Sequence, residues 1–148
     1  MLFWLKKSEN WSEYFRSFDN SIINDLFEGQ LLSETVCNTC NTKSSSFDNF
    51  QDLSLSFARG VKMVSDFSLE RLLESHMKEE QLIDYFCVKC KKSRSSSRKF
   101  LIWKLPKILF VHLKRFAFGP TRKQKLTYNV TFPLILDMSI FVNESSSR

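Results

Sequence analysis

All four cysteines of this 148-residue chain lie in two short stretches of the same form, Cys37-x-x-Cys40 and Cys87-x-x-Cys90. A C-x-x-C knuckle lets two thiolates converge on one point, so two knuckles can supply four sulfur ligands. Four thiolates suit a tetrahedral Zn²⁺ ion with Zn–S bonds of about 2.3 Å, and soft sulfur ligands disfavour Mg²⁺ and Ca²⁺. The pattern therefore predicts a structural zinc site, closed to substrate, that joins two segments far apart in the sequence.

Other uses of four cysteines make different demands. A thioredoxin-like redox pair needs no second copy and usually follows a βαβ pattern, and two local disulfides need an oxidising compartment. An iron–sulfur cluster also takes four cysteines and stays open as an alternative. The interval between Cys40 and Cys87 is far longer than in a compact zinc ribbon. We therefore favour zinc and expect the intervening residues to form an excursion of strands and a helix.

The spacing of apolar residues predicts an α+β, β-rich fold. Residues 8–27 carry apolar side chains at helical intervals, and Ser17–Ser21 offers stop and cap residues, so one helix or two short ones fit, with Gly29 as the stop. Residues 30–57 predict strands on both sides of the first knuckle, and residues 83–105 repeat this arrangement around the second.

The remaining segments predict a loop, a helix and two further strands. Lys91–Lys99 is basic and serine-rich, which predicts a mobile, solvated loop. Residues 68–80 are the clearest amphipathic helix, with a serine at the N-cap position. Residues 108–116 are apolar on both alternating faces, which predicts a central strand covered on both sides. Gly119–Lys125 predicts a turn, and Leu126–Phe132 predicts a further strand.

The charge is distributed unevenly along the chain. Residues 1–84 hold 8 Lys and Arg against 14 Asp and Glu, whereas residues 85–148 hold 14 against 2. A basic half is compatible with nucleic-acid binding, because neutralising phosphates releases counterions. No RNP-type aromatic motif or helix-turn-helix pattern accompanies the charge, however. We therefore interpret it as a solvated basic face and do not expect nucleic acid to be the partner.

The lengths of the apolar runs indicate the cellular compartment of the protein. None approaches the ~18 residues of a membrane span, and the start MLFWLKKSEN has neither a basic segment before its apolar run nor a cleavage site after it. We expect no membrane span and an intracellular, cytoplasmic setting, in which thiols stay reduced.

The residues offer no recognisable catalytic constellation. If all four cysteines bind metal, no free thiol remains. His76 falls on the apolar face of the predicted helix, so we expect a packed or boundary residue. His112 falls in the middle of the predicted central strand, so we expect a satisfied core histidine. No Cys–His pair or Ser/His/Asp set is visible. The residues alone therefore indicate a zinc-stapled, mostly β, intracellular binding module.

Several stretches nevertheless resemble one family, the ubiquitin-specific proteases, which are papain-like cysteine deubiquitinases. The matching stretches are LFEGQLLSETVCNTC, FDNFQDLSLSF, FCVKCKKSRSSSRKFLIWKLPKILFVHLKRF and KLTYNVTFPLILDM. Their order and spacing agree with the family over about residues 21–140. The combination of both knuckles with Leu105-Pro106 and the run His112–Phe116 is highly specific. Within the family, the motifs look closest to the subgroup of ubiquitin carboxyl-terminal hydrolase 8.

The resemblance implies a papain-like cysteine protease fold shaped like a hand, with thumb, palm and fingers. Residues 1–148 would be a partial catalytic domain, in which 21–105 form mainly the fingers with an inserted helix, 106–140 form palm strands, and 141–148 form a frayed tail. Zinc would tip the fingers on four ligands, Cys37, Cys40, Cys87 and Cys90. The partners implied are ubiquitin and ubiquitinated proteins, because the family's thiolate cleaves after the C-terminal glycine of ubiquitin.

The departures from the family matter for activity. The family's nucleophile lies in a box resembling G-x-x-N-x-C-Y-x-N and its catalytic histidine in a box containing G-H-Y, and this sequence contains neither. No catalytic residue is therefore assigned, and we expect a fragment of a deubiquitinating isopeptidase that is inactive alone. Two alternatives stay open: a non-catalytic, zinc-dependent ubiquitin-binding or scaffold module, and a basic zinc-ribbon nucleic-acid binder.

Overall fold

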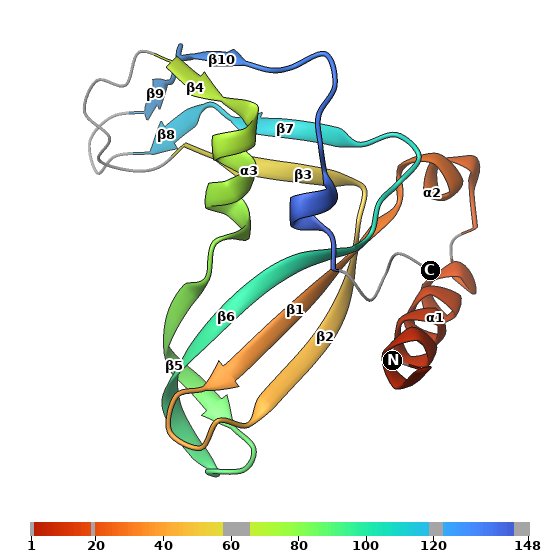
Figure 1. Cartoon of the computed structure of the whole chain (residues 1–148), viewed down its shortest axis with the longest axis vertical. Coiled ribbons are helices and arrows are strands. Elements are labelled where there is room, and N and C mark those ends of the chain that lie inside the picture. Colours follow the sequence, from red (N-terminus) through yellow and green to blue (C-terminus); the bar gives the residue numbers. More distant parts are fainter. Residues whose placement is uncertain (1, 19, 58–65, 119–122, 144–148) are drawn as a thin grey trace.

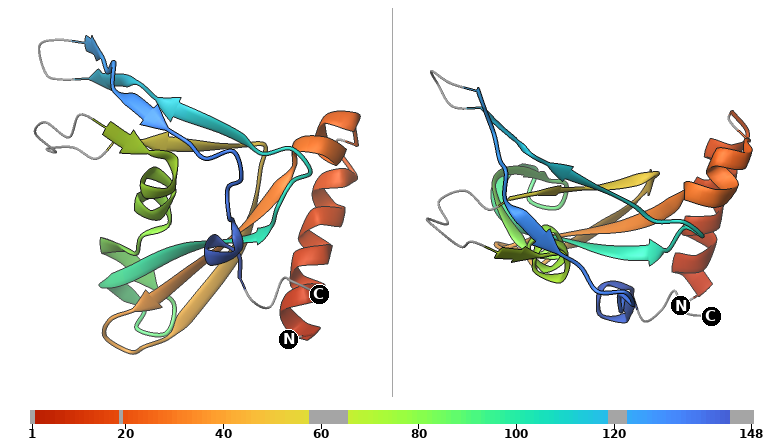
Figure 2. Two further views of the ribbon diagram at one scale, coloured as in Figure 1. Left: turned by 45° about the horizontal axis from the view of Figure 1, so that its top comes forward. Right: turned by 90° about the horizontal axis from the view of Figure 1, so that it is seen from above.

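The structure is a computed structural model that describes residues 2–18, 20–57, 66–118 and 123–143. Figure 1 shows a long four-stranded arm and, at its upper end, a corner in which short strands surround a helix. Of the two N-terminal helices, the long first one lies beside the arm and the short second one lies at its upper end, as the views in Figure 1 and Figure 2 show. The predicted α+β, β-rich fold class is confirmed.

The arm is one antiparallel sheet. Its strands are β1 (Gly29–Cys37), β2 (Lys43–Phe50), β5 (Glu80–Cys87) and β6 (Lys92–Lys104). They lie in the order β2-β1-β6-β5, so the two knuckle-bearing hairpins are neighbours and β1 pairs with β6. Both knuckles consequently lie at the far end of the arm (Figure 1).

The serine-rich stretch corrects one expectation. Lys91–Lys99 is not a solvated loop, because β6 begins at Lys92 and pairs with β1 on one side and β5 on the other. Hydrogen bonds to two neighbouring strands satisfy its backbone, which overrides the weak strand preference of its side chains. Ser96, in the middle of this stretch, is fully buried.

The corner is built from pairs of short strands. β3 (Asp52–Ser56) runs parallel to β7 (Phe110–Lys114), β4 (Asp66–Ser68) runs parallel to β10 (Asn129–Thr131), and β8 (Phe116–Phe118) is antiparallel to β9 (Lys123–Lys125). A 3-10 helix at Ser139–Phe141 then returns the chain to the arm. There Val142 forms a parallel bridge with Ile102 of β6, which links corner and arm.

Helix α3 (Leu69–Met77) lies in the corner, and the amphipathic pattern correctly predicted a helix here with one buried face. Its N-cap is Ser68, whose Oγ accepts a hydrogen bond from the backbone N–H of Arg71 at 3.3 Å. The helix is shorter than predicted, because Glu80 already belongs to β5. Its buried residues join the main core, which consists of Leu53, Leu55, Phe57, Leu72, Leu73, Met77, Ile102 and Phe141.

Strand β7 corrects a second expectation. It was predicted to be a central strand covered on both sides, but within the described residues it pairs with β3 alone. Val111 and Leu113 pack against the main core, whereas Phe110 on the other face is 55% exposed. Apolar composition on both faces therefore does not mean burial of both faces within this chain.

The N-terminal segment forms two helices, α1 (Leu2–Arg16) and α2 (Ile22–Phe27). The two-helix alternative is thus the correct one, with Ser21 as the N-cap of α2. α1 contacts the arm through Leu5, which packs on a small second core of Leu32, Phe47 and Trp103. Ser8 of α1 also donates a hydrogen bond to the side chain of Gln30.

Gly29 has a different role from the predicted helix stop. The C-cap of α2 is Glu28, and Gly29 is the first residue of β1. A Cβ at Gly29 would overlap the ring of Phe50 and lie 2.8 Å from the carbonyl oxygen of Lys104. The glycine therefore permits three strands to approach closely at the root of the arm.

Two expectations fall partly outside the described residues. Of the predicted turn Gly119–Lys125, residues 119–122 are not described, and the rest forms β9. Of the predicted tail, residues 144–148 are not described, while Phe141 lies in the main core.

The predicted strand Leu126–Phe132 is reduced to the three residues of β10. No described helix has the length and apolar character needed to cross a membrane.

Candidate metal centre

The two C-x-x-C turns are built in the same way. In each turn a backbone N–H, that of Asn41 or Lys91, donates to the carbonyl oxygen of the first cysteine, at 2.9 and 2.8 Å. These two residues have φ angles of 54° and 52°, in the left-handed region that residues other than glycine rarely adopt. Each chain reversal is therefore tight, and the same geometry occurs at both ends of the predicted ligand set.

Strand pairing brings the two turns to one place. Cys37 ends β1 opposite Ser96, and Cys87 ends β5 opposite Lys92, so both turns sit beside β6. The four Sγ atoms lie within 4.8 Å of one another, and those of Cys40 and Cys87 are 3.5 Å apart. A regular tetrahedron with bonds of about 2.3 Å has sulfur–sulfur distances of about 3.8 Å. The four sulfurs that the sequence singled out can thus share one ion.

Hydrogen bonds around the first turn favour ionised sulfur. The Oγ1 of Thr42 lies 3.2 Å from the Sγ of Cys40, and its hydroxyl together with its backbone N–H lowers the pKa of Cys40 to about 6. The backbone N–H of Cys40 likewise lowers the pKa of Cys37. Sequence analysis did not single out Thr42, although a hydroxyl residue two positions after a knuckle is a signal it could have used.

The four thiols also oppose one another's ionisation. The hydrogen bond with Cys40, together with burial, raises the pKa of Cys90 to about 12. A group of adjacent thiols cannot lose all its protons without a compensating cation, and a bound metal ion supplies that charge. The sulfur-only donor set, the tetrahedral spacing and the burial of Cys37 and Cys87 support structural Zn²⁺ as the cofactor.

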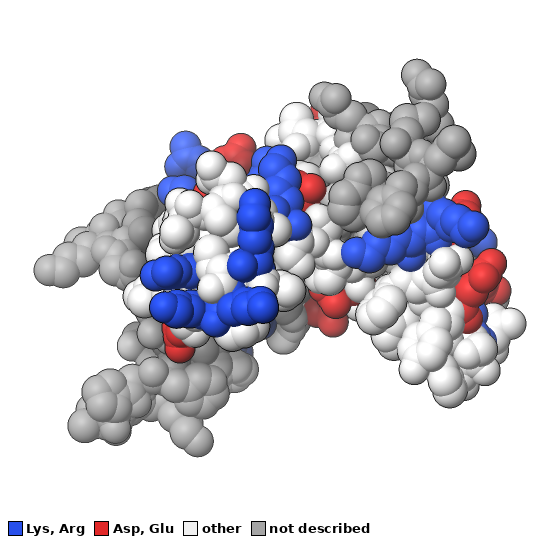
Figure 3. Space-filling view, turned by 90° about the horizontal axis from the view of Figure 1, so that it is seen from below, with Lys and Arg blue, Asp and Glu red and all other residues white. Residues whose placement is uncertain are grey.

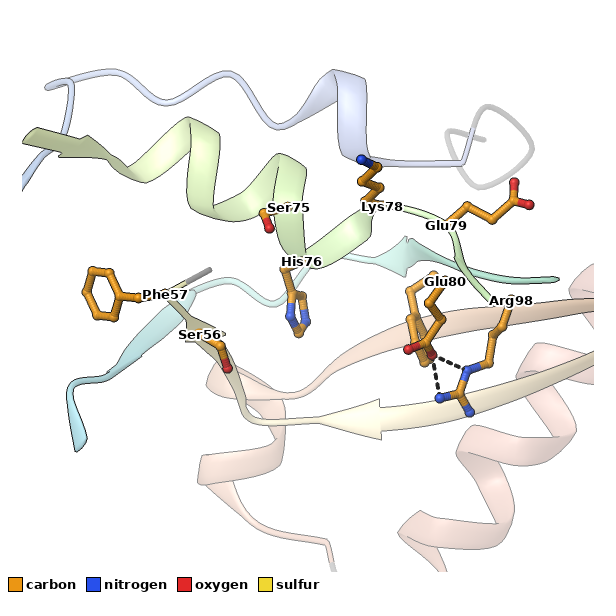
Figure 4. Close-up of a pocket in the computed structure, with 9 residues that line it drawn as sticks. Ser56, Phe57, Ser75, His76, Lys78, Glu79, Glu80 and Arg98 are labelled. Carbon is orange, nitrogen blue, oxygen red and sulfur yellow. Dashed lines mark hydrogen bonds and ion pairs between the residues drawn. The ribbon is translucent and has the colours of Figure 1, made fainter. Parts of the chain in front are cut away.

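A cleft of about 460 Å³ lies where the arm meets the corner (Figure 4). It is lined by residues from the end of β3, the last turn of α3, the start of β5 and the middle of β6. There Arg98 Nε donates to Glu80 Oε1 at 2.6 Å, and the guanidinium lies 5.0 Å from the ring centroid of Phe100. Glu80 and Arg98 are far apart in sequence and meet because β5 pairs with β6, so no local motif could have predicted the cleft.

The two histidines take different positions. His76 points into the cleft and is half-buried, which fits the boundary alternative of the prediction (Figure 4). Burial, with a smaller effect of the Lys114 charge, lowers the pKa of His76. His112 is not a core histidine, since its side chain is exposed on β7, where Nδ1 lies 3.2 Å from the hydroxyl of Ser54 on β3.

A zinc-tipped arm joined to a mixed α/β corner can be compared with known proteins. The sequence profile described as ubiquitin carboxyl-terminal hydrolase matches residues 1–148, the whole chain. The chain therefore belongs to the ubiquitin carboxyl-terminal hydrolase family, and its resemblance to the ubiquitin-specific proteases is confirmed.

Individual relatives agree with this assignment. Ubiquitin carboxyl-terminal hydrolase 2 from Gallus gallus is 38% identical over 147 residues, which are 97% of this chain and 40% of that protein. The Homo sapiens protein of the same name is 38% identical over 149 residues, covering 97% of this chain and 24% of that protein. The chain thus spans 40% or less of the length of these relatives. The predicted placement near hydrolase 8 stays a prediction.

Solved structures share the fold. The SAGA DUB module of Ubp8, Sgf11, Sus1 and Sgf73 bound to monoubiquitin has a TM-score of 0.73 and 31% identity, covering 86% of this chain and 28% of that chain. The same module bound to ubiquitin aldehyde has a TM-score of 0.72 and 27% identity, covering 96% of this chain and 32% of that chain. Both similarities extend over most of the arm and corner.

Proposed function

We propose that this chain is the zinc-tipped fingers and partial palm of a deubiquitinating thiol isopeptidase, and that it binds ubiquitin. The observation that carries the proposal is the convergence of four remote cysteines at the tip of an arm whose fold matches DUB modules bound to ubiquitin. In this assignment residues 21–105 are mainly fingers with the inserted helix, and residues 106–140 are palm strands. Cys37, Cys40, Cys87 and Cys90 are the zinc ligands.

The proposed ubiquitin cradle is the angle between the arm and the corner. The cleft with the Glu80–Arg98 ion pair lies in this angle, and His76 reaches into it from α3. The exposed face of β7 lies near the cleft, since Lys114 affects the pKa of His76 and pairs in register with Ser56, which lines the cleft. The same exposed face of β7 carries Phe110 at the other end of the strand, where its ring stacks on Phe27 of α2. A concave polar cleft with an exposed apolar residue on the adjoining strand suits a globular protein partner.

The metal acts here through structure. When bound, Zn²⁺ holds the two hairpin tips together and so fixes the arm against which ubiquitin rests. The side chains of this chain then form the surface that contacts ubiquitin. The charge of the bound Zn²⁺ balances the ionised sulfurs. A closed site of four sulfurs leaves no coordination position for substrate or water.

We further propose that catalysis uses groups outside these 148 residues. Every cysteine of the sequence lies in the metal centre, and neither His76 nor His112 forms a hydrogen bond with a described cysteine. In the longer protein, a thiolate would attack the carbonyl carbon of the last glycine of ubiquitin, the C–N bond would break, and the amine would leave with a proton from a histidine. Water would then hydrolyse the thioester and regenerate the thiol. Ubiquitinated proteins would then be the substrates.

A non-catalytic ubiquitin-binding or scaffold role is the second candidate, favoured by the use of every cysteine at the metal centre. The two candidates differ in the longer protein: cleavage of a ubiquitin–lysine isopeptide bond supports the first, and binding without cleavage supports the second. We also propose an intracellular, cytoplasmic location, which is supported by cysteines arranged as metal ligands, because such thiols must stay reduced.

The binding proposal is tested by titrating isotope-labelled ubiquitin with the zinc-loaded chain and following ubiquitin amide shifts by NMR. We expect saturable shifts that Phe110→Asp weakens about tenfold or more, because it places a charge in the proposed contact. Phe132→Asp is the matched control, since Phe132 is also largely exposed and lies outside the proposed cradle. Shifts that are absent, or equally weakened by both variants, would contradict the proposal.

Inactivity of the isolated chain is tested separately. The zinc-loaded chain is incubated with ubiquitin carrying a C-terminal electrophile, and intact mass is measured. We expect no adduct, because all four thiols are held by metal. An adduct on Cys37, Cys40, Cys87 or Cys90 would overturn both the assignment of those residues as ligands and the absence of a nucleophile.

A further inference from the structure

The second knuckle carries a surface that neither the metal centre nor the proposed ubiquitin cradle uses. Two exposed apolar residues and three exposed lysines surround the turn between β5 and β6. This surface, the tip patch, consists of Phe86, Val88, Lys89, Lys91 and Lys92.

The apolar part of the tip patch faces away from the cradle. Side chains alternate along β6, so Arg98, which lines the cleft, shares a face with Arg94 and not with Ser93. Phe86 is the direct partner of Ser93 and therefore lies on the face opposite the cleft. Phe86 is 61% exposed and Val88 78% exposed. Two large apolar side chains at the end of a narrow hairpin mark an interaction site better than a single exposed residue would.

The charge of the tip patch is strongly one-sided. Residues 87–99 contain six Lys and Arg and no Asp or Glu. Within the described part of the chain, Lys89, Lys91 and Lys92 form no ion pair. A zinc ion with four thiolates carries a net charge of about −2 and offsets only part of this excess. Figure 3, which views the molecule from the tip end, shows Lys and Arg gathered on the arm with few acidic residues among them.

The patch is also rigidly presented. Val88 and Lys89 lie between the two cysteines of the knuckle, and the Lys91 N–H is bonded to the Cys87 carbonyl oxygen at 2.8 Å. A turn fixed at both ends loses little conformational entropy when a partner binds. The patch is therefore preorganised by the same ion that holds the arm together.

The neighbouring strand edge indicates how a partner would bind. β5 is an outer strand of the sheet, but its register with β6 shifts between Leu82 and Tyr85. Such a bulge blunts an edge against the addition of another strand. Contact through side chains is therefore favoured over extension of the sheet.

We propose that the tip patch docks an acidic segment of a partner protein that also carries apolar side chains. The apolar side chains cover Phe86 and Val88, and the carboxylates pair with the surrounding lysines, so charge complementarity fixes the chemistry of the partner. Single-stranded nucleic acid fits less well, because its binding sites stack successive bases on several aromatic rings. The tip patch offers one ring beside an aliphatic residue. This inference does not depend on ubiquitin binding.

The proposal is tested by fluorescence anisotropy with the zinc-loaded chain. The probes are a labelled peptide of about ten residues in which Asp and Glu alternate with Leu and Phe, its Lys and Arg counterpart, a labelled single-stranded oligonucleotide, and labelled ubiquitin. We expect saturable binding of the acidic peptide that weakens with added salt. We expect binding to fall about tenfold in Phe86→Ala/Val88→Ser and again in Lys89→Ser/Lys91→Ser/Lys92→Ser.

A matched control variant shows whether peptide binding depends on the tip patch or only on the general positive charge of the chain. Lys104→Ser/Lys107→Ser removes exposed lysines elsewhere, and we expect it to leave peptide binding within about twofold. Zinc stoichiometry, measured on every variant, shows that the knuckle is intact. The proposal is overturned if the acidic peptide does not bind, if the control variant weakens binding equally, or if the apolar variant has no effect. It is also overturned if the oligonucleotide binds more tightly than the peptide, or if the patch variants weaken ubiquitin binding instead.

Discussion

The tip of the arm and the corner are stabilised in opposite ways. Near the tip, the buried side chains between the strands are small and polar, such as Thr35 and Ser96, and they end at the buried sulfurs of Cys37 and Cys87. In the corner, α3 and β3 bury leucine side chains such as Leu55 and Leu73, which are fully inaccessible. The arm therefore needs an ion where the corner relies on apolar packing.

This difference explains why a narrow arm can extend from a small domain. A buried leucine contributes about 2 kcal/mol through the hydrophobic effect, and a four-stranded ribbon has few positions shielded on both sides. A structural zinc ion supplies on the order of 10 kcal/mol in small zinc domains. One ion can thus stabilise the tip of the arm as much as several buried apolar residues would.

Removal of the ion should have the largest effect, and it tests whether the tip depends on metal while the corner does not. Chelation of zinc, or Cys87→Ser, should abolish hydrogen-exchange protection in residues 31–48 and 85–100, because on the order of 10 kcal/mol of local stabilisation is lost. Residues 108–116 should stay protected, since β7 packs on the main core. Exchange measured by mass spectrometry with and without chelator checks this. Uniform loss of protection would show that the two regions fold as one unit.

The converse test weakens the corner. Leu73→Ala should destabilise the chain by about 2–5 kcal/mol, because it leaves a cavity in the main core. Ile135→Ala, at a residue that is 89% exposed, should change stability by less than about 0.5 kcal/mol. Urea unfolding at saturating zinc measures both. Zinc affinity should stay the same in Leu73→Ala, and a large drop in affinity would mean that the corner also holds the knuckles in place.

A matched pair of serine substitutions compares the regions on a smaller scale. Ser68→Ala should cost about 1 kcal/mol, because it removes the N-cap of α3. Ser96→Ala should be neutral or stabilising by up to about 1 kcal/mol, because the buried Oγ of Ser96 has no hydrogen-bond partner among the described residues. Thermal unfolding of the two variants side by side checks the order. A cost for Ser96→Ala as large as that for Ser68→Ala would show that the arm depends on its buried hydroxyls.

The smallest expected effect is a pH dependence in the corner. Burial, and then the charge of Lys114, lowers the pKa of His76 in the folded chain. The folded chain therefore binds this proton less readily than the unfolded chain, so the stability contributed by neutral His76 is present above the ordinary histidine pKa of about 6.5 and is lost as pH falls. Lys114→Gln should raise the pKa of His76, as followed by NMR titration of the ring. An unchanged pKa would exclude the Lys114 contribution.

Much of the fold could be predicted from local patterns. The amphipathic repeat and serine cap placed α3, the cap residues at Ser17–Ser21 allowed the observed break between α1 and α2, and the paired knuckles predicted a four-sulfur centre. These features succeed because each depends on neighbours a few residues apart, or on a residue type with little alternative use in a reducing setting.

The failures have a shared cause in pairing between distant segments. Lys91–Lys99 has the composition of a loop but is held extended between β1 and β5. β7 has the composition of a strand covered on both faces, but only the face with Val111 and Leu113 packs on the main core, and His112 on the other face is exposed. Local composition reports the side chains a segment offers, and it does not report which segments will lie on either side.

The four-sulfur donor set follows from the sequence alone, because the only four cysteines form two C-x-x-C knuckles of equal form. Tertiary structure alone decided what surrounds that donor set: the Glu80–Arg98 ion pair in the cleft, the outward face of Phe86, and the close approach at Gly29. Each of these arises where strands from distant parts of the chain come into register. Register is set by the summed packing and hydrogen bonding of whole strands, a property that no single motif contains.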